Sequence, residues 1–205
     1  MGDIIVFNKF YKRKGGSDMC SEITVERKKE IETIVTELLK NVDFTKSPYV
    51  DIVKLVEGKG FSVETSDMDI ETTGFLYADS ENKIKRITVN KKFKNPDGEE
   101  DVIFKKSRFI TAHEYGHYIL HRKEGQMVVL YRDTYHRSEP DELEADYFAR
   151  SILMPLTQFQ LFYEIAQELG KGDEEFVTNL LSLAFKVTRN KVNRRINDLK
   201  ELKLA

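Results

Sequence analysis

The stretch that most constrains this chain is 107–121, which reads SRFITAHEYGHYILH and has an H-E-x-x-H pattern at its centre. Residues four apart lie one turn above each other on the same face of a helix. His113 and His117 can therefore direct ring nitrogens at one metal ion, while Glu114 lies about 100° round the helix. In zinc peptidases an acid at that position takes a proton from a water on the ion. The pattern predicts a zinc site with Glu114 as its catalytic base.

A bare H-E-x-x-H pattern also arises by chance in helices whose histidines are simply solvated. Here the neighbouring apolar or small residues follow the 3–4 spacing of a buried stripe, and both histidines lie along it: Phe109, Ala112, Gly116 and Leu120. Histidines turned toward a core need a partner, and a metal ion supplies one. Gly116 costs about 1 kcal/mol relative to Ala inside a helix, so we expect another segment to pack closely against it.

A zinc site also needs a third protein ligand from elsewhere in the chain. His121 continues the histidine face, but it lies about 12 Å along the helix axis from His113, too far to share the ion. A second helix is predicted from 141 to about 153, and Glu142 lies near its start. We predict that Glu142 is the third ligand.

The acids around Glu142 have different expected roles. Asp146 lies one turn further along on the same face, so we predict that it accepts a hydrogen bond from a ligand histidine and orients it. Ala145 is small enough to allow close helix packing. Asp141 and Glu144 suit the simpler role of stabilising a helix N-terminus.

These residues carry a family resemblance. The run RFITAHEYGHYILH, with E-x-x-A-D at 142–146 and FARSILMP at 148–155, resembles the ImmA/IrrE family of zinc metallopeptidases, most specifically over 87–155. The resemblance implies an α+β, zincin-like metallopeptidase domain, in which the active-site helices lie beside a small antiparallel or mixed sheet. It also implies one Zn²⁺ ion per chain.

The resemblance further implies a zinc-dependent endopeptidase that cleaves a regulatory partner. The expected substrate is a helix-turn-helix transcriptional repressor, whose cleavage would derepress genes of a phage, a mobile element or a stress response. The alternative is a non-catalytic regulator that binds a repressor or DNA and uses the zinc structurally. Glu114 favours the enzyme, because a structural zinc site usually fills all four positions with protein ligands.

The composition is that of an ordinary globular protein. The 205 residues are 40% hydrophobic and 33% charged, and a formal net charge of −2 argues against affinity of the whole molecule for nucleic acid. No apolar run approaches the roughly 20 residues of a membrane span and the N-terminus does not resemble a signal peptide, so we expect a cytoplasmic protein without membrane contact. The single cysteine, Cys20, excludes an internal disulfide and fits a reducing compartment.

We predict three parts: a flexible N-terminal arm at 1–24, a metallopeptidase domain at 25–155 and a helical subdomain at 156–205. The simpler expectation for the arm is partial order. A sharper hypothesis makes Cys20 a thiolate that caps the zinc in a latent form, although no motif surrounds it.

Periodicity and turn residues predict the elements of the central domain. We expect, in order, a helix at 24–41, a helix from Pro48 to Gly58, a strand at 61–64, and a hairpin of strands 74–77 and 84–89. The metal helix is expected to begin at 99–102 or near Ser107. The resemblance implies that residues 84–90 form the sheet edge that holds a substrate as an added strand.

The segment 125–139 connects the two metal helices and is expected to border the cleft. A peptidase needs a donor for the oxyanion that forms on the amide carbonyl. The candidates are Tyr131, Tyr135 and His136, although each also suits the simpler role of a surface polar residue.

The rest of the chain is predicted to be helical, at 157–169, 174–185 and 188–202, and the last two helices resemble a helix-turn-helix. Residues 185–205 contain seven basic and two acidic residues. If the last helix recognises nucleic acid, its candidate contacts are Arg189, Arg194 and Arg195. We favour the simpler interpretation, a helical subdomain that braces the metal helices and exposes a solvated basic face.

Overall fold

The computed structural model describes residues 23–69, 72–91, 100–122, 128–132 and 140–204, with the backbone alone described at 128–132. Over these residues the elements are, in order, α1 (Val25–Leu39), α2 (Ile52–Glu57), β1 (Ser62–Ser66), β2 (Gly74–Asp79), β3 (Ile84–Asn90), α3 (Glu100–His121), β4 (Val128–Arg132), α4 (Pro140–Leu153), α5 (Leu156–Gly170), α6 (Glu174–Phe185) and α7 (Arg189–Leu204). The described part of the chain has no helix with the length and apolar character needed to cross a membrane.

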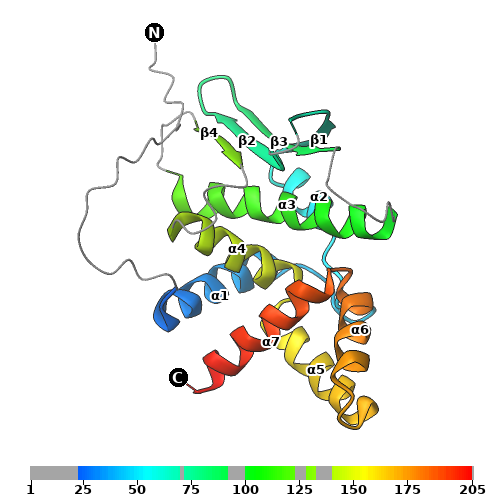
Figure 1. Ribbon diagram of the computed structural model, residues 1–205. Coiled ribbons are helices and arrows are strands. Elements are labelled where there is room, and N and C mark those ends of the chain that lie inside the picture. The colour runs from blue at the N-terminus through cyan, green and yellow to red at the C-terminus, as the bar shows by residue number, and fades with distance from the viewer. Residues whose placement is uncertain (1–22, 70–71, 92–99, 123–127, 133–139, 205) are drawn as a thin grey trace, which may run out of the picture.

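Four strands form one mixed sheet in the order β1-β3-β2-β4. β1 runs parallel to β3, and β2 runs antiparallel to both β3 and β4. The β2–β3 hairpin turns where the sequence predicted, because Asp79 accepts hydrogen bonds from the backbone N–H groups of Glu81 and Asn82 at 2.9 and 3.2 Å. Figure 1 shows the sheet on one side of α3 and the helices α4, α1 and α5 to α7 on the other. The predicted α+β class is confirmed.

The predicted role of residues 84–90 as a sheet edge is wrong. β3 lies in the interior of the sheet, where Ile87 pairs with Val63 of β1 on one side and with Leu76 of β2 on the other. Its backbone hydrogen bonds are therefore directed at neighbouring strands rather than at a substrate. Among the described strands the edges are β1 and β4, and β4 lies within the segment 125–139 that connects the two metal helices.

The second helix begins later than the sequence predicted. Asp51 is the N-cap of α2, and its side chain accepts a hydrogen bond from the backbone N–H of Lys54 at 3.2 Å. The preceding carbonyl of Val50 is bound by Arg108 of α3 at 2.6 Å. These two contacts hold the chain between Pro48 and Asp51 outside the helix.

The helices at both ends of the chain match their predictions closely. Thr24 caps α1 and Asp173 caps α6, each through its side chain. α6 ends where Lys186 adopts a left-handed conformation with φ 51°, and α7 follows within three residues. One hydrophobic cluster joins Ile31 of α1, Phe148 of α4 and Phe185 of α6, so the core contains residues from both sides of the predicted boundary after residue 155.

Candidate metal centre

Three ligand side chains converge between α3 and α4. The Nε2 atoms of His113 and His117 lie 3.0 Å apart. Glu142, near the start of α4, places one carboxylate oxygen 3.2 Å from His113 Nε2 and the other 3.0 Å from His117 Nε2. The structure thus brings together the three residues that the sequence predicted as metal ligands.

Close packing of the two helices makes this convergence possible. At Gly116 on α3, an added Cβ would lie 2.9 Å from the ring of Phe148 on α4, closer than real Cβ contacts. Ala145, three residues before Phe148 on α4, is also fully buried. A bulkier residue at Gly116 would push α4 away, and Glu142 would move away from the histidines with it. The predicted close approach at Gly116 is confirmed.

The chemistry of these groups fits a divalent metal ion. Asp146 lies 3.0 Å from Nδ1 of His113 and its carboxylate can only accept a hydrogen bond, so this nitrogen carries the proton and Nε2 presents a lone pair. Tetrahedral zinc ligands with nitrogen or oxygen donors lie about 3.3 Å apart, close to the separations seen here. Burial acts to raise the pKa of Glu142, but the neighbouring His113 and His117 lower it further, so the carboxylate stays ionised. Two imidazoles and one carboxylate are a donor set that zinc accepts.

Glu114 lies beside the ligands and is fully buried. It follows His113 directly on α3, so the helix turns it toward the sheet instead of toward Glu142. At Gly74, the first residue of β2, an added Cβ would lie 3.7 Å from Oε1 of Glu114 and 2.6 Å from Ile110. The absence of a side chain at Gly74 therefore lets α3 and its carboxylate approach the sheet.

Several predicted residues fall where little or nothing is described. Tyr135, His136 and Cys20 lie outside the described residues. The backbone of Tyr131 lies in β4, where it pairs with Phe75 of β2. The oxyanion donors and the thiolate cap therefore stay predictions.

The prediction that Arg195 contacts nucleic acid is wrong. Its side chain is 0% exposed, and it donates hydrogen bonds to Glu32 of α1 at 2.6 Å and to the carbonyl of Met154 at 3.0 Å. The neighbouring Arg194 points to solvent, because consecutive helical residues differ by about 100°.

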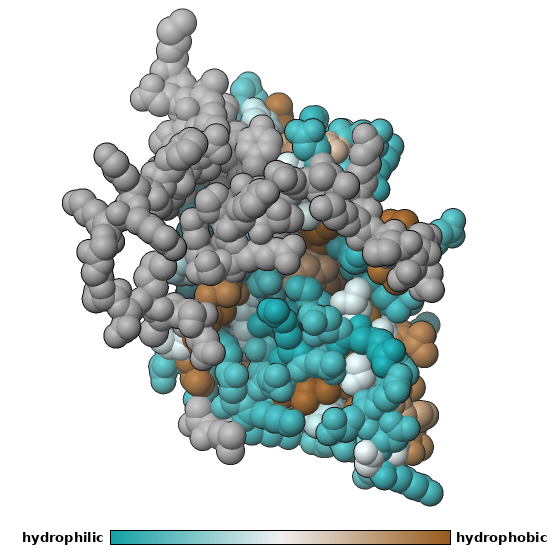
Figure 2. All heavy atoms as spheres, in the orientation of Figure 1, coloured by the Kyte–Doolittle hydropathy of each residue, from teal (hydrophilic) through white to brown (hydrophobic). Residues whose placement is uncertain are grey.

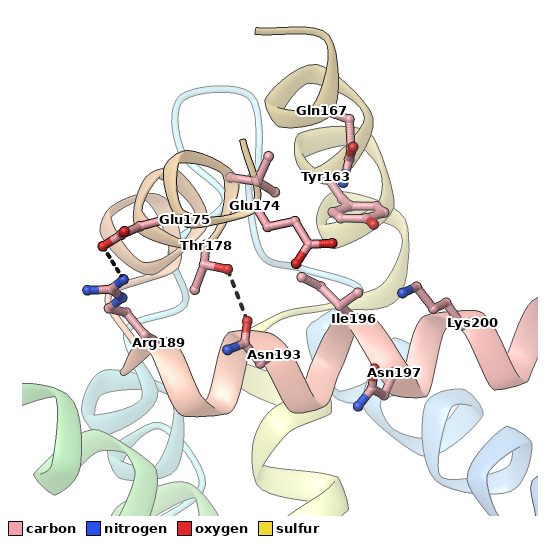
Figure 3. A pocket seen from close by; sticks show the side chains of 11 residues that line it. Tyr163, Gln167, Glu174, Glu175, Thr178, Arg189, Asn193, Ile196, Asn197 and Lys200 are labelled. Atoms are coloured by element: carbon pink, nitrogen blue, oxygen red, sulfur yellow. Dashed lines mark hydrogen bonds and ion pairs between the residues drawn. The ribbon is translucent and has the colours of Figure 1, made fainter. Parts of the chain in front are cut away.

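The exposed side of α7 is polar. Figure 2 shows the face on which α7 lies, where most of the described surface is hydrophilic. A groove of about 360 Å³ runs between α7 and the helices α5 and α6. In Figure 3, Arg189 at one end of this groove pairs with Glu175 at 2.7 Å, and Asn193 accepts a hydrogen bond from Thr178 at 3.0 Å.

Two histidines and a glutamate on packed helices, with a buried glutamate beside them, define a metallopeptidase-type hydrolase. The family model of the IrrE N-terminal-like domain matches residues 56–197. The match covers more than half of the chain, so the chain belongs to this family, whose peptidase chemistry implies a metal ion. Among curated proteins, none matches the chain.

Proposed function

We propose that the protein is a zinc-dependent endopeptidase. The observation that carries this proposal is the convergence of His113, His117 and Glu142 beside the buried Glu114. Bound zinc would lower the pKa of a water molecule and polarise the scissile carbonyl. The described residues offer three ligands and so leave one tetrahedral position for that water, which a catalytic site requires and a structural site lacks.

Glu114 moves the protons of the reaction. Its place next to His113 on α3 puts it beside the reacting water without making it a ligand. It accepts a proton as the water attacks the carbonyl, and it then donates that proton to the nitrogen of the leaving amine. Burial excludes bulk water from its carboxylate, so the transferred proton stays within the site.

We further propose that the substrate adds to the sheet at β4. Gly74 lies next to Glu114 and pairs with Arg132 at the end of β4, which is an edge of the described sheet. The outer side of β4 is therefore one strand away from Gly74, whereas the other edge, β1, lies beyond β3. An extended peptide bound to β4 through backbone hydrogen bonds would pass beside the metal centre.

The proposed substrate is a helix-turn-helix repressor, and its cleavage would release phage, mobile-element or stress genes. Membership of the IrrE N-terminal-like domain family supports the peptidase activity, and the regulatory partner is what the resemblance to the ImmA/IrrE family implies.

The test compares wild type with Glu114→Gln in the native cell. New protein N-termini are catalogued by mass spectrometry with and without stress, and the zinc content of both purified proteins is measured. We expect a repressor fragment with wild type only, and zinc in both, because Gln keeps the size of the side chain but cannot accept the proton. Equal cleavage by the variant would refute the role of Glu114.

A second candidate function is DNA or repressor binding through the C-terminal helices without catalysis. The observation that favours it is the three-residue connection between α6 and α7, beside which Lys186, Arg189 and Arg194 are exposed. DNA binding through these residues would weaken steeply with salt and would be lost in Arg194→Ala. Zinc bound in wild type and Glu114→Gln, with no fragment in either, would favour this function.

A further inference from the structure

Nδ1 of His117, the ring nitrogen on the far side from Glu142, contacts a residue that the sequence excluded as a metal ligand. His121 lies one turn further along α3, and its Nδ1 is 3.1 Å from Nδ1 of His117. It therefore contacts the opposite side of the His117 ring from Nε2, the atom that faces Glu142. His121 is not a metal ligand, but it holds a ligand.

The contact continues from His121 to a carboxylate and an arginine. Nε2 of His121 lies 3.2 Å from Glu144 of α4, and Glu144 accepts a hydrogen bond from Arg27 of α1 at 2.7 Å. The side chains of His121 and Glu144 are only 15% and 20% exposed. The sequence suggested that Glu144 only stabilises the start of α4, whereas the structure makes it a bridge between α1, α3 and α4.

The carboxylate of Glu144 fixes the direction of the hydrogen bonds that connect it, through His121, to His117. Glu144 can only accept, so Nε2 of His121 carries a proton and Nδ1 of His121 has a lone pair. That lone pair accepts the proton on Nδ1 of His117. With a metal ion between His117 and Glu142, His117 would then present an unprotonated Nε2, which is the form that binds the ion.

We propose that His121 and Glu144 are positioning residues that fix the tautomer and ring orientation of His117, with Arg27 anchoring them to α1. The inference rests on the metal centre of the proposed function. In this arrangement each ligand histidine has its own carboxylate acceptor: Asp146 binds His113 directly, and Glu144 is linked to His117 through His121. Arg27 lies outside the residues that match the family model, so this anchor comes from a part of the chain that precedes the match.

The test measures zinc affinity by competition with a chromophoric chelator, after the wild-type dissociation constant is established. His121→Leu removes both hydrogen bonds, and we expect it to weaken zinc binding by about 10–100-fold. In His121→Gln the amide oxygen can accept from His117 and the amide nitrogen can donate to Glu144. We expect this variant to stay within about threefold of wild type, since the bonds that orient a ligand are kept.

A matched pair of acids tests the next step. Glu144 and Glu30 both bind Arg27, but Glu30 is 62% exposed and lies on the same helix as Arg27, three residues further along. We expect Glu144→Leu to weaken zinc binding and Glu30→Leu to leave it unchanged. Thermal unfolding of the metal-free proteins is the control. We expect equal melting temperatures for the two His121 variants, so a difference in their zinc affinity would reflect the orientation of His117 and not a loss of the fold.

Three outcomes would contradict the inference, its mechanism or the proposed function. Wild-type affinity in His121→Leu would overturn the inference while leaving the proposed function intact, and equal losses in His121→Leu and His121→Gln would overturn the tautomer mechanism. A wild-type protein that binds no zinc would instead refute the proposed function itself.

Discussion

At the scale of single residues, two neighbouring arginines show what burial does to a charge. Arg195 is fully buried against Glu32, whereas Arg194 is exposed. We expect Arg195→Met to lower the free energy of unfolding by about 3–5 kcal/mol, because it leaves the carboxylate of Glu32 buried without its cation. Arg194→Met is the matched control and should change stability by less than about 0.5 kcal/mol. Equal denaturant midpoints for the two variants would contradict this account.

The same pair predicts how stability depends on pH. Burial acts to raise the pKa of Glu32, but the charge and hydrogen bonds of Arg195 outweigh it and hold the pKa below 4.5. A lowered carboxyl pKa contributes stability above the unfolded pKa, and this stability is lost as the pH falls through the folded pKa. We therefore expect the free energy of unfolding to fall below about pH 4.5. Glu32→Gln cannot titrate and should show a shallower fall; a variant with the wild-type slope would exclude Glu32 as the cause.

The sequence identified the residues of the metal centre better than their supports. His113, His117 and Glu142 could be chosen because the four-residue spacing and the family pattern both point to them. His121 was excluded as a ligand by its distance along α3, and its four-residue spacing from His117 places the two rings on one face; the sequence could not show that Glu144 of α4 would bind the other side of His121. The burial of Arg195 depends on α1, which lies more than 150 residues away in the sequence, so a basic run alone suggested a surface.

At the scale of elements, the spacing between β2 and α3 depends on Gly74. An added Cβ there would lie 2.6 Å from a methyl of Ile110 and 3.0 Å from the carbonyl oxygen of Thr88. We expect Gly74→Ala to lower stability by about 1–3 kcal/mol, since α3 must move away from the sheet. It should also slow substrate cleavage more than it weakens zinc binding, because Glu114 faces Gly74 and the ligands face α4.

Gly58→Ala is the control for this substitution. An added Cβ at Gly58 would meet only the carbonyls of Lys54 and Leu55 at 3.4 Å, and its φ of −61° suits any residue. Chemical denaturation should place this variant within about 0.5 kcal/mol of wild type. If Gly74→Ala were as stable as Gly58→Ala, the close approach of β2 and α3 at Gly74 would not matter for stability.

Helices were easier to predict than strands for a physical reason. The apolar spacing and side-chain caps of α1 and α6 lie within the helices themselves, at Thr24 and Asp173. The start of α2 depends instead on Arg108, which binds the carbonyl of Val50 from a distant helix. β4 was missed although 127–131 reads Met-Val-Val-Leu-Tyr, a run rich in strand-forming residues, and its pairing with β2 is non-local. The interior place of β3 follows from its parallel pairing with β1, a strand that the sequence predicted without indicating its partner.

At the scale of the whole molecule, the C-terminal helices complete the core that holds the metal helices. Arg150 of α4 binds Asp198 of α7 at 2.8 Å, and Lys28 of α1 lies 3.6 Å from the same carboxylate. Arg108 of α3 donates to the carbonyl of Phe185 at the end of α6 at 2.9 Å. The ion pairs join α1, α4 and α7 around one cluster of buried charges, and the hydrogen bond of Arg108 ties α3 to the end of α6. Such an arrangement favours unfolding in a single step over two independent domains.

Truncation after residue 155 tests whether the protein unfolds as one cooperative unit or as the two domains that the sequence suggested. A chain of residues 1–155 would lack the side chain that neutralises Glu32 and the apolar contacts of Phe159, Phe185 and Leu199. We expect it to show no cooperative thermal transition and to bind zinc weakly, because α4 loses the helices that pack against it. Adding the separate segment 156–205 should restore both properties, since the missing contacts are non-covalent. A truncated chain that melts cooperatively near the full-length temperature would instead establish 25–155 as an independent domain, and the C-terminal helices would then be free to serve a partner alone.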